Sequence, residues 1–464
     1  MSAPDNCTAS YRDYFSREGG SLSWLALLGC MLTVLSFPAE ADDLSASTLA
    51  ADSKPVGKGT STHNGVGEDP EDPHNLLLGI RERRTQKDSL FSQSPLHEVH
   101  EATERWKQTL YDATGLELGF AYNQLFQTVS ETLPGTDSSG TASTVDLIGT
   151  WELLNRGDPT QGRLVFGVQG RWNWGTTGPE NLGTESLGSM SRPGNTFAEY
   201  TPTFLIRNLF WEQGSQEAGW VYRFGKITPD AILSTSAHVA APLTFTSTAG
   251  VGSFANALPD SGLGAVVDWY INDRIKLLGL VSDSNADRLD WGNINEGDLY
   301  KAIELGVQIF PRTEKAGWSK LTVWHNDGTK DGSASNGNLG PDGWGYFLKL
   351  EQELTADGRL IGIAKYGRSH NNSALYESQA NLLFLYYDPD FIGHIQNDVV
   401  GIAFNYVETN LEGSRGEYNP ELFYRFPLFP QVDATLTYHS IINPALDPNN
   451  DHASVYSLRL RSTF

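Results

Sequence analysis

The last stretch of the chain, HASVYSLRLRSTF at residues 452–464, constrains the fold more than any other. At a spacing of two, its apolar and polar side chains fall on opposite faces, which is the periodicity of a β-strand. The apolar set is Tyr456, Leu458, Leu460 and Phe464, and the polar set is Ser457, Arg459 and Arg461. A soluble sandwich could use such a strand. A terminal aromatic residue without a polar tail favours instead the closing strand of an outer-membrane barrel.

Length and composition fit one large barrel. The chain has 464 residues, and no Pro- or Ser-rich linker divides its middle. A helical membrane protein needs about 20 consecutive apolar residues for each span. Such a run is missing beyond the N-terminus, and the mean hydropathy is −0.34. The 47 glycines and 11% aromatic residues suit many turns and interfacial girdles. We therefore predict an all-β, transmembrane antiparallel β-barrel.

The N-terminus carries a predicted signal peptide, residues 1–41. An apolar run from Leu22 to Phe37 is followed by Ala39-Glu40-Ala41, a typical cleavage site. A lipoprotein box ending at Cys30 is the alternative, but the apolar run continues past it. Both cysteines, Cys7 and Cys30, lie in this segment, so the mature chain would have no thiol. Export to the cell outer membrane of a Gram-negative bacterium is expected.

Residues 42–93 are predicted to form a flexible N-terminal segment, since residues 42–75 are rich in Ser, Gly, Pro and Asp. Residues 94–114 are predicted to form a periplasmic amphipathic helix, with Ser94 as N-cap and Gly115 as the stop. Its apolar residues at helical spacing are Leu96, Val99, Ala102, Trp106 and Leu110. Packing at the periplasmic rim is one interpretation, and a partial plug or an assembly contact is the other.

Residues 115–464 are predicted to form the barrel, with about sixteen strands. Strand starts are predicted near residues 115, 144, 162, 201, 219, 262, 274, 300, 318, 342, 359, 378, 397, 416, 431 and 453. The gaps between these strands alternate between long and short. Barrels of this kind have an even strand number, short periplasmic turns and long outer loops. The long gaps, including 127–143 and 175–200, are therefore predicted to be external.

Strand phase predicts which side chains line the pore. In residues 162–174, Leu164, Phe166 and Trp172 fall on the outward face, which leaves Arg171 inside. In residues 219–226, the outward aromatic residues leave Arg223 inside. A rim salt bridge or a contact with lipid headgroups is an equally good explanation for both arginines.

The third long gap, residues 228–261, is unusually long and weakly charged. It is rich in Ala, Ser, Thr and Gly, and its ionisable residues are Asp230, His238 and Asp260. Such a loop is predicted to fold into the barrel and narrow the channel. An external cap or a trimer contact is the alternative. The candidate pore-lining and substrate residues are Arg171, Arg223, Lys226, Asp230, His238 and Asp260.

Motifs for catalysis or for cofactors are weak. Residues 219–226 have the wrong spacing for a phosphate loop, and residues 283–287 lack the glycine that a calcium loop requires. No hydrolase or metalloprotease motif occurs, and the ten histidines are scattered. We expect no enzyme activity, no metal and no cofactor. The net charge of −23 makes nucleic acid an unlikely partner.

Several segments, taken in order, resemble the carbohydrate-selective porin (OprB) family. They are YRFGKITPD, SGLGAVVDWYINDRIKLLGLVSDSNAD, PQVDATLTYHSIINPALDP and SLRLRSTF, and the similarity spans roughly residues 110–464. The resemblance implies a sixteen-stranded barrel with an inward loop and with arginine, acidic and aromatic side chains at its constriction. The acidic composition and residues 42–75 depart from the family and leave the solute open.

The function implied is passive, selective diffusion of mono- or small oligosaccharides across the outer membrane. A general or cation-preferring porin is the main alternative, and an outer-membrane enzyme or a structural barrel is a more distant one. The expected partners are small carbohydrates, outer-membrane lipid and lipopolysaccharide. A homotrimer is left open.

Overall fold

The computed structural model describes residues 89–464, except residues 95, 196, 198–202, 287–288, 290, 293, 314–315, 329–341, 394 and 396. The chain divides into two compact units, residues 1–62 and 63–464, and every described residue belongs to the second. The predicted signal peptide and residues 42–88 of the predicted flexible segment lie outside the described residues.

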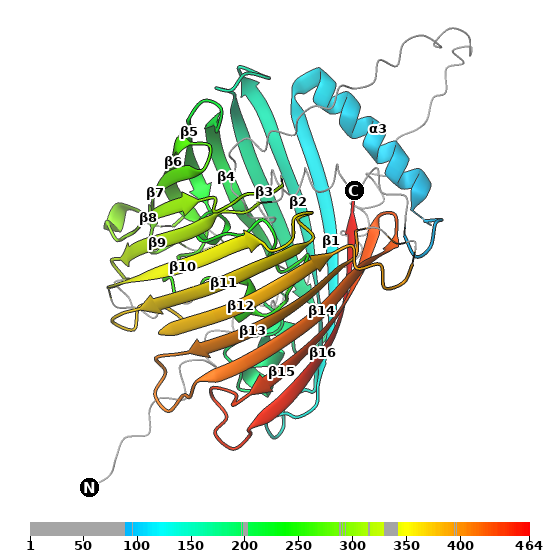
Figure 1. Ribbon diagram of the computed structural model, residues 1–464, viewed down its shortest axis with the longest axis vertical. Coiled ribbons are helices and arrows are strands. Elements are labelled where there is room, and N and C mark those ends of the chain that lie inside the picture. The colour runs from blue at the N-terminus through cyan, green and yellow to red at the C-terminus, as the bar shows by residue number, and fades with distance from the viewer. Residues whose placement is uncertain are drawn as a thin grey trace, which may run out of the picture. The chain divides into compact units, whose positions relative to one another are not determined.

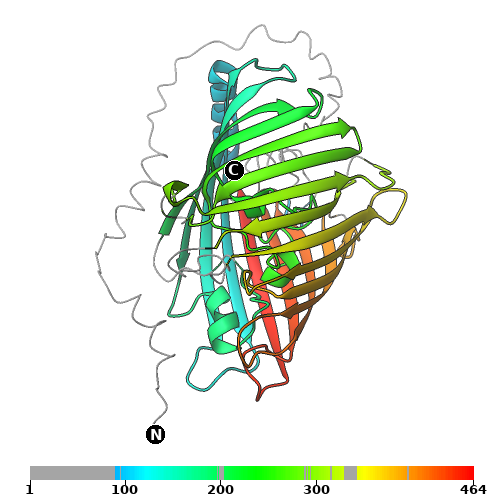
Figure 2. The ribbon, with the colours of Figure 1, turned by 90° about the vertical axis from the view of Figure 1, so that its left-hand side faces the viewer.

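Sixteen antiparallel strands of the described chain form one closed barrel, in which each strand pairs with its sequence neighbours and β1 pairs with β16 (Figures 1 and 2). The strands are β1 Leu116–Val129, β2 Ser139–Leu154, β3 Gly162–Asn173, β4 Thr203–Ser215, β5 Trp220–Ile227, β6 Gly262–Asn272, β7 Ile275–Asp283, β8 Leu299–Val307, β9 Ser319–Asn326, β10 Gly343–Glu353, β11 Leu360–Ser369, β12 Ser378–Tyr387, β13 Val399–Glu408, β14 Glu417–Phe429, β15 Val432–Ile442 and β16 His452–Thr463. The predicted transmembrane barrel is therefore confirmed. Most strands begin within two residues of the prediction, whereas β2 begins at Ser139, five residues before it.

Burial alternates along the strands, as a barrel with a filled interior requires. On β12, for example, Gln379, Asn381, Leu383 and Leu385 are buried, and Leu382 between them is exposed. The outer face carries large apolar side chains in the same alternation. Three of them, Trp220, Tyr222 and Phe224, stack along β5 with centroid distances of 5.6 and 6.4 Å. In the part of the chain that the structure describes, no second sheet covers this apolar exterior, which suits contact with lipid.

Short helices occur in the loops of the described chain. They are α4 Pro179–Asn181, the π-helix η2 Leu182–Ser186, the 3₁₀-helices η3 Pro229–Ala231 and η4 Ile294–Glu296, and α5 Thr248–Val251. In the part of the chain that the structure describes, no helix has the length and apolarity needed to cross a membrane.

The long helix α3, His97–Thr114, precedes β1. It ends where predicted, because Gly115 adopts a left-handed conformation (φ 76°) and its N–H bonds to the carbonyl oxygen of Tyr111. It begins at His97, three residues later than predicted. The helix packs through a different face from the predicted one: Lys107 and Tyr111 face the barrel, whereas Val99 and Trp106 are exposed.

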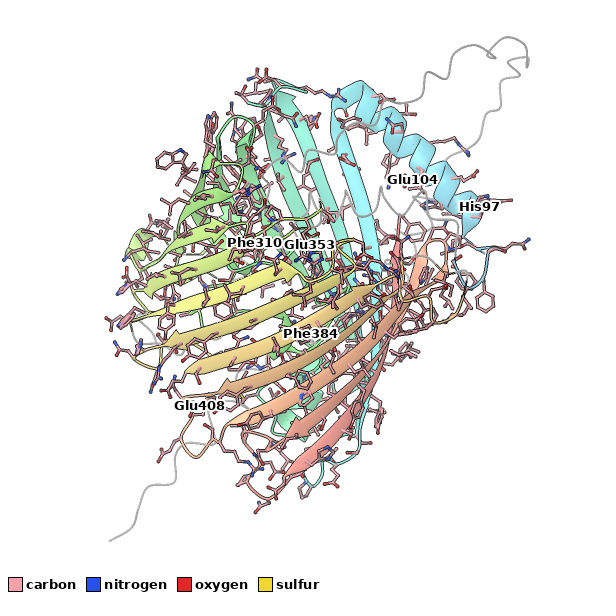
Figure 3. The ribbon with its side chains drawn as sticks, in the orientation of Figure 1. His97, Glu104, Phe310, Glu353, Phe384 and Glu408 are labelled. Carbon is pink, nitrogen blue, oxygen red and sulfur yellow. The ribbon has the colours of Figure 1, made fainter. Side chains whose placement is uncertain are left out.

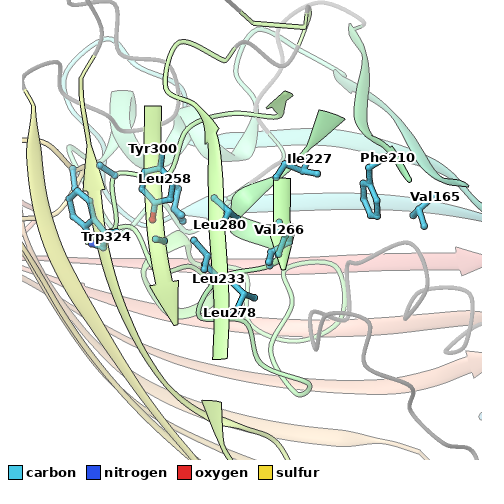
Figure 4. Close-up of a cluster of buried hydrophobic side chains, with 14 residues drawn as sticks. Val165, Phe210, Ile227, Leu233, Leu258, Val266, Leu278, Leu280, Tyr300 and Trp324 are labelled. Atoms are coloured by element: carbon cyan, nitrogen blue, oxygen red, sulfur yellow. The ribbon is translucent and has the colours of Figure 1, made fainter. Parts of the chain in front are cut away.

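The largest hydrophobic cluster of the described residues lies inside the barrel, between strands and the segment that joins β5 to β6. Leu233 and Leu258 of that segment pack against Val266, Leu280 and Trp324 of the inner wall (Figure 4). A wide barrel would otherwise leave apolar inner side chains in water. The segment between β5 and β6 packs against these side chains and removes them from water.

Candidate pore constriction

Residues 228–261 fold into the barrel as predicted, and we call this segment the inner loop. Its first part is held by β8 and β9. The carboxylate of Glu304 accepts the Ser234 N–H at 2.6 Å, and the Lys320 ammonium donates to the Thr235 hydroxyl at 2.8 Å. Farther along, the Asn326 side chain donates to the Ala257 carbonyl at 2.8 Å. The backbone groups of this buried loop thus find partners on the wall.

The middle of the inner loop is held by β14 and β15. The Glu421 carboxylate accepts the Thr246 N–H at 2.6 Å and the Ser247 hydroxyl at 2.7 Å. The ring Nε2 of His439 lies 3.0 Å from the Thr246 hydroxyl, and its Nδ1 lies 3.8 Å from the Glu421 carboxylate. Because both strand residues are fully buried, this contact fixes the loop from the inside of the wall.

Three further strands bind backbone carbonyls of the same loop. Lys365 on β11 donates to Gly250 at 2.9 Å, and Arg459 on β16 donates to Thr244 at 2.9 Å. On β12, Gln379 donates to the Ala249 carbonyl at 2.8 Å. The hydrogen bonds of the inner loop are therefore spread over strands from β8 to β16. The loop covers that side of the interior.

A second loop also turns inward, which the sequence did not predict. The segment between β3 and β4 was expected to be external, yet its residues 189–191 bind the buried carboxylate of Glu417. Glu417 accepts the Met190 N–H at 2.9 Å and the Ser191 N–H at 3.0 Å. The two loops touch, since the Thr248 N–H donates to the Arg192 carbonyl at 3.0 Å. Of this loop, residues 196 and 198–202 are not described.

Another part of the wall, built by β1, β2, β3 and β16, carries a chain of polar side chains that we call the polar wall. Arg171 donates to Gln169 at 2.6 Å, and Gln169 donates to the Asp146 carboxylate at 2.6 Å. Asn123 reaches the other carboxylate oxygen at 3.4 Å, and Arg461 donates to Asn123 at 2.8 Å. Guanidinium, amide and carboxylate groups thus alternate across four adjacent strands, on the inner face of the barrel.

Arg207 joins the polar wall to the base of the inner loop. It sits at the bulge where the β3–β4 register shifts, and its guanidinium lies 3.7 Å from the Asp230 carboxylate. Its backbone carbonyl accepts the Thr228 hydroxyl at 2.6 Å, which fixes where the loop leaves β5. The Asp146 carboxylate interacts with the guanidinium groups of Arg171, Arg207 and Arg461. Arginines from three strands therefore converge on one half-buried carboxylate.

The predicted residues are distributed over different places. Arg171 belongs to the polar wall, and Asp230, 38% exposed, lies beside Arg207. Arg223 is on the inner face but only 2% exposed, between Glu212 at 2.7 Å and Asp268 at 2.9 Å. Both of these contacts are ion pairs within the wall.

The other three predicted residues are buried away from the polar wall. His238 contacts the Tyr387 hydroxyl at 2.7 Å, and Asp260 is buried near the end of the inner loop. Lys226 pairs in register with Leu209 and Leu263 and shares the strand phase of the outward aromatic residues of β5. Its ammonium lies 5.8 Å from the centre of the Trp291 ring. Lys226 does not share the lumenal face with Arg223.

Two charged residues of the polar wall, Asp146 and Arg461, and the neighbouring Arg207 of β4 were absent from the predicted site. Each is a charged residue inside an otherwise apolar or alternating strand, a signal that strand phase alone could have used. The inward aromatic pair Tyr300 and Trp324 stacks at 6.2 Å but is buried under the inner loop. These two rings do not face the polar wall.

Metal chemistry has no evident place in the described residues, where no group of three His, Cys, Asp or Glu side chains could hold an ion. The arrangement instead gathers hydrogen-bond donors and acceptors on one part of the inner wall: Asp146 is half-buried, and Arg171, Gln169, Asn123 and Arg461 are each 8% exposed or less. Such groups can replace the hydration of a passing polar solute without forming a covalent bond.

A closed sixteen-strand barrel with a loop folded into its lumen has the architecture of a porin. Among solved structures, the chain is similar to the high-pH structure of Pseudomonas putida OprB, with a TM-score of 0.62 and 13% identity over 78% of this chain and 97% of that chain. The low-pH structure of the same protein gives a TM-score of 0.48 at 12% identity over 78% and 96% of the two chains. A mutant of Rh. blastica porin gives 0.43 at 11% identity over 75% and 100%.

The resemblance to the carbohydrate-selective porins is thus confirmed at the level of the fold. No protein-family model matches the chain, and no curated protein matches its sequence. At 13% identity, this similarity establishes the fold.

Proposed function

We propose that the protein is an outer-membrane porin through which mono- or small oligosaccharides diffuse passively and selectively. The observation that carries the proposal is the polar wall, where donors and acceptors alternate along Arg171, Gln169, Asp146, Asn123 and Arg461. A sugar presents hydroxyls that both donate and accept. A row of mixed partners can therefore exchange bonds with it step by step.

Passage depends on weak binding. Each neutral hydrogen bond contributes only about 0.5–1.5 kcal/mol net, because the solute leaves water bonds behind. A sugar on the polar wall is thus held briefly and released, as conduction requires. Arg207 and Asp230 set opposite charges near the base of the inner loop, 3.7 Å apart, so neither sign dominates there. This balance suits a neutral solute better than an ion of either sign.

The test is conductance in planar bilayers while sugars of increasing length are added. Wild-type channels should show saturable block by sugar. In the variant Asp146→Asn, the amide keeps the shape but loses the carboxylate that orients Gln169 and Asn123. Block should then weaken by about fivefold to tenfold, the equivalent of about 1–1.4 kcal/mol. Because a negative charge is removed, the reversal potential in a salt gradient should shift in the direction that indicates greater anion selectivity.

The alternatives give different results in the same experiment. Ion conduction with cation preference and without sugar block would indicate a general porin, the alternative that the net charge of −23 favours. No conductance at all would indicate an enzyme or a structural barrel. A matched control is Glu408→Gln, which removes an exposed carboxylate at the end of β13, away from the polar wall.

The proposal extends to surroundings and assembly. The apolar exterior is expected to contact outer-membrane lipid and lipopolysaccharide, and the end of the barrel where β1 begins is assigned to the periplasm. A homotrimer is part of the proposal, to be checked by mass measurement of the detergent-extracted protein. Passive diffusion of a sugar past the polar wall requires no cofactor.

A further inference from the structure

Helix α3 presents three different faces, which Figure 3 helps to locate through the labelled His97 and Glu104. Successive helical residues are turned by about 100°, so residues three and four apart share a face. One face is packed, with Glu104 and Lys107 forming an ion pair beneath it. The second face is charged and exposed; its residues are Glu98, Glu101, Arg105, Gln108 and Asp112. The third is apolar and exposed; its residues are Val99, Ala102, Trp106 and Ala113.

Among the described residues, the apolar face is left largely exposed. Trp106 is 56% exposed and Val99 is 42% exposed. On the helical wheel the three faces lie roughly a third of a turn apart, from the rotation of about 100° per residue. A helix that touches protein and water alone needs two faces. A third, apolar face indicates a third environment.

The helix lies along the outside of one barrel rim. The His100 ring lies 6.3 Å from the Phe464 ring, and Phe464 lies 6.1 Å from Phe120. By strand phase both phenylalanines point outward. At the other end of the helix, the Trp151 indole N–H donates to the Thr114 carbonyl at 3.1 Å, and Trp151 is itself an exposed outward residue of β2.

These contacts place α3 at the lipid-facing aromatic belt rather than across the pore. Outward aromatic residues at a barrel rim mark the boundary between hydrocarbon and headgroups. The chain before the helix keeps to the same rim, since the Phe91 N–H donates to the Leu428 carbonyl at 3.0 Å and the Phe91 and Phe429 rings lie 5.4 Å apart. The segment 89–114 is thus tied to the rim at both ends.

We propose that α3 is an interfacial helix whose apolar face, Val99, Ala102, Trp106 and Ala113, inserts into the phospholipid headgroup layer beside the barrel. An amphipathic helix lies in the plane of a membrane when its apolar face can enter the boundary between headgroups and acyl chains. The packed face holds the rim, the charged face meets water, and the apolar face meets lipid. The occupant is a phospholipid surface, because the helix contacts the outward aromatic residues Phe464 and Trp151 of the same rim, through His100 and the Thr114 carbonyl.

The test uses spin labels on the full chain in phospholipid vesicles, with Cys7 and Cys30 replaced by serine. Single labels are placed at Ala102→Cys and Trp106→Cys on the apolar face. Glu101→Cys on the charged face is the aqueous control, and Ile303→Cys, a 62% exposed outward position on β8, is the lipid control. Collision with oxygen, which concentrates in lipid, is compared with collision with a water-soluble nickel chelate.

Labels at Ala102 and Trp106 should collide with oxygen more than with nickel, as at Ile303, whereas Glu101 should show the reverse. A nickel-dominated result at both apolar positions would overturn the proposal, because it would place that face in water. Low access to both reagents, rising on dilution of the protein in lipid, would also overturn it in favour of a second copy of the chain. A heat-modifiable gel band verifies that each labelled barrel is folded.

Discussion

At the scale of single residues, Arg223 shows that the side of the wall on which a residue lies does not by itself determine its role. Its inward phase was predicted from the outward aromatic residues of β5, and the structure confirms that phase. Its partners come from β4 and β6, and Arg163 adds a second guanidinium, 2.6 Å from Glu212. The result is a chain of alternating charges along the inner wall. Strand phase predicts the side of the wall, but cross-strand partners depend on register.

Arg223→Ala should therefore destabilise the barrel rather than change ion selectivity or sugar block. Glu212 and Asp268 are 1% and 3% exposed, so the loss of Arg223 leaves carboxylates buried and undercompensated. Breaking a buried ion pair from one side typically costs about 3–5 kcal/mol. Unfolding in urea from lipid vesicles should report a loss of this order.

The control is Arg223→Ala combined with Asp268→Asn, which removes one of the stranded charges and should recover part of the loss. Arg171→Ala should cost less stability than Arg223→Ala, since Arg171 donates to the side-chain amide of Gln169, whereas Arg223 donates to two buried carboxylates. If Arg223→Ala left stability intact but altered sugar block, Arg223 would instead belong to the solute path.

At the scale of elements, the barrel strands follow from local sequence, whereas the inward loops require more. Alternating side chains and turn residues mark the strands, so most predicted starts agree with the structure. The inner loop was predictable from its length and low charge. The second inward loop was not, because it is held by Glu417, a residue more than 200 positions away that accepts from Ser189, Met190 and Ser191. Long-range anchors leave little trace in a local pattern.

Glu421→Ala should loosen the inner loop. The carboxylate accepts from the backbone and hydroxyl groups of Thr246 and Ser247, and hydrogen bonds to a charged group contribute about 1.5–3 kcal/mol each. Without it, single-channel conductance should rise and open-channel noise should increase. Single-channel recording in planar bilayers measures both.

The matched control is Glu408→Ala on the adjacent strand β13, whose carboxylate accepts from Ser378 at an exposed position. This change removes the same charge without touching the inner loop, and its conductance should stay at the wild-type value. Equal conductance in wild type and Glu421→Ala would mean that the remaining anchors hold the loop without Glu421.

The loops after β1 and β3 offer a prediction for pH. Hydroxyl donation by Thr176, and then by Thr177, at 2.6 Å each, lowers the pKa of the Asp137 carboxyl below its ordinary value. A depressed pKa means that the folded state favours the carboxylate. The stabilisation from these two hydrogen bonds is therefore fully present above the unfolded pKa of about 3.9, and it is lost as the pH falls through the lower folded pKa. Distances between spin labels at Ser138→Cys and Gly175→Cys should stay narrow from pH 7 to pH 5 and broaden only in stronger acid. Asp137→Ala should be broad throughout, and a wild-type protein that broadened near neutrality would contradict the assignment.

At the scale of the whole molecule, closure of the barrel is the property that the terminal strand predicted. β16 pairs with β1 along nine residues, and Phe464 exchanges two backbone hydrogen bonds with Phe120, at 2.8 and 3.0 Å. Closure removes the open edges that a sheet would expose to lipid, where backbone groups have no water to bind. The polar wall depends on it, because the Asn123–Arg461 bond crosses this seam.

The seam itself can be tested with a disulfide. Tyr122 and Ser462 are direct partners across β1 and β16, and directly opposite residues of an antiparallel pair have Cα atoms about 4.5–5.5 Å apart, within the range that a disulfide spans. In a chain whose native cysteines are replaced, Tyr122→Cys with Ser462→Cys should therefore oxidise in the folded barrel. The cross-link joins the first strand to the last, so the heated, unreduced protein should migrate faster than its reduced form.

The pair Tyr122→Cys with Leu436→Cys places the second cysteine on β15, one strand removed from β1, and should stay reduced. Oxidation of both pairs to the same extent would indicate an open or mobile sheet instead of a closed barrel, and the assignment of the polar wall across the seam would be lost with it.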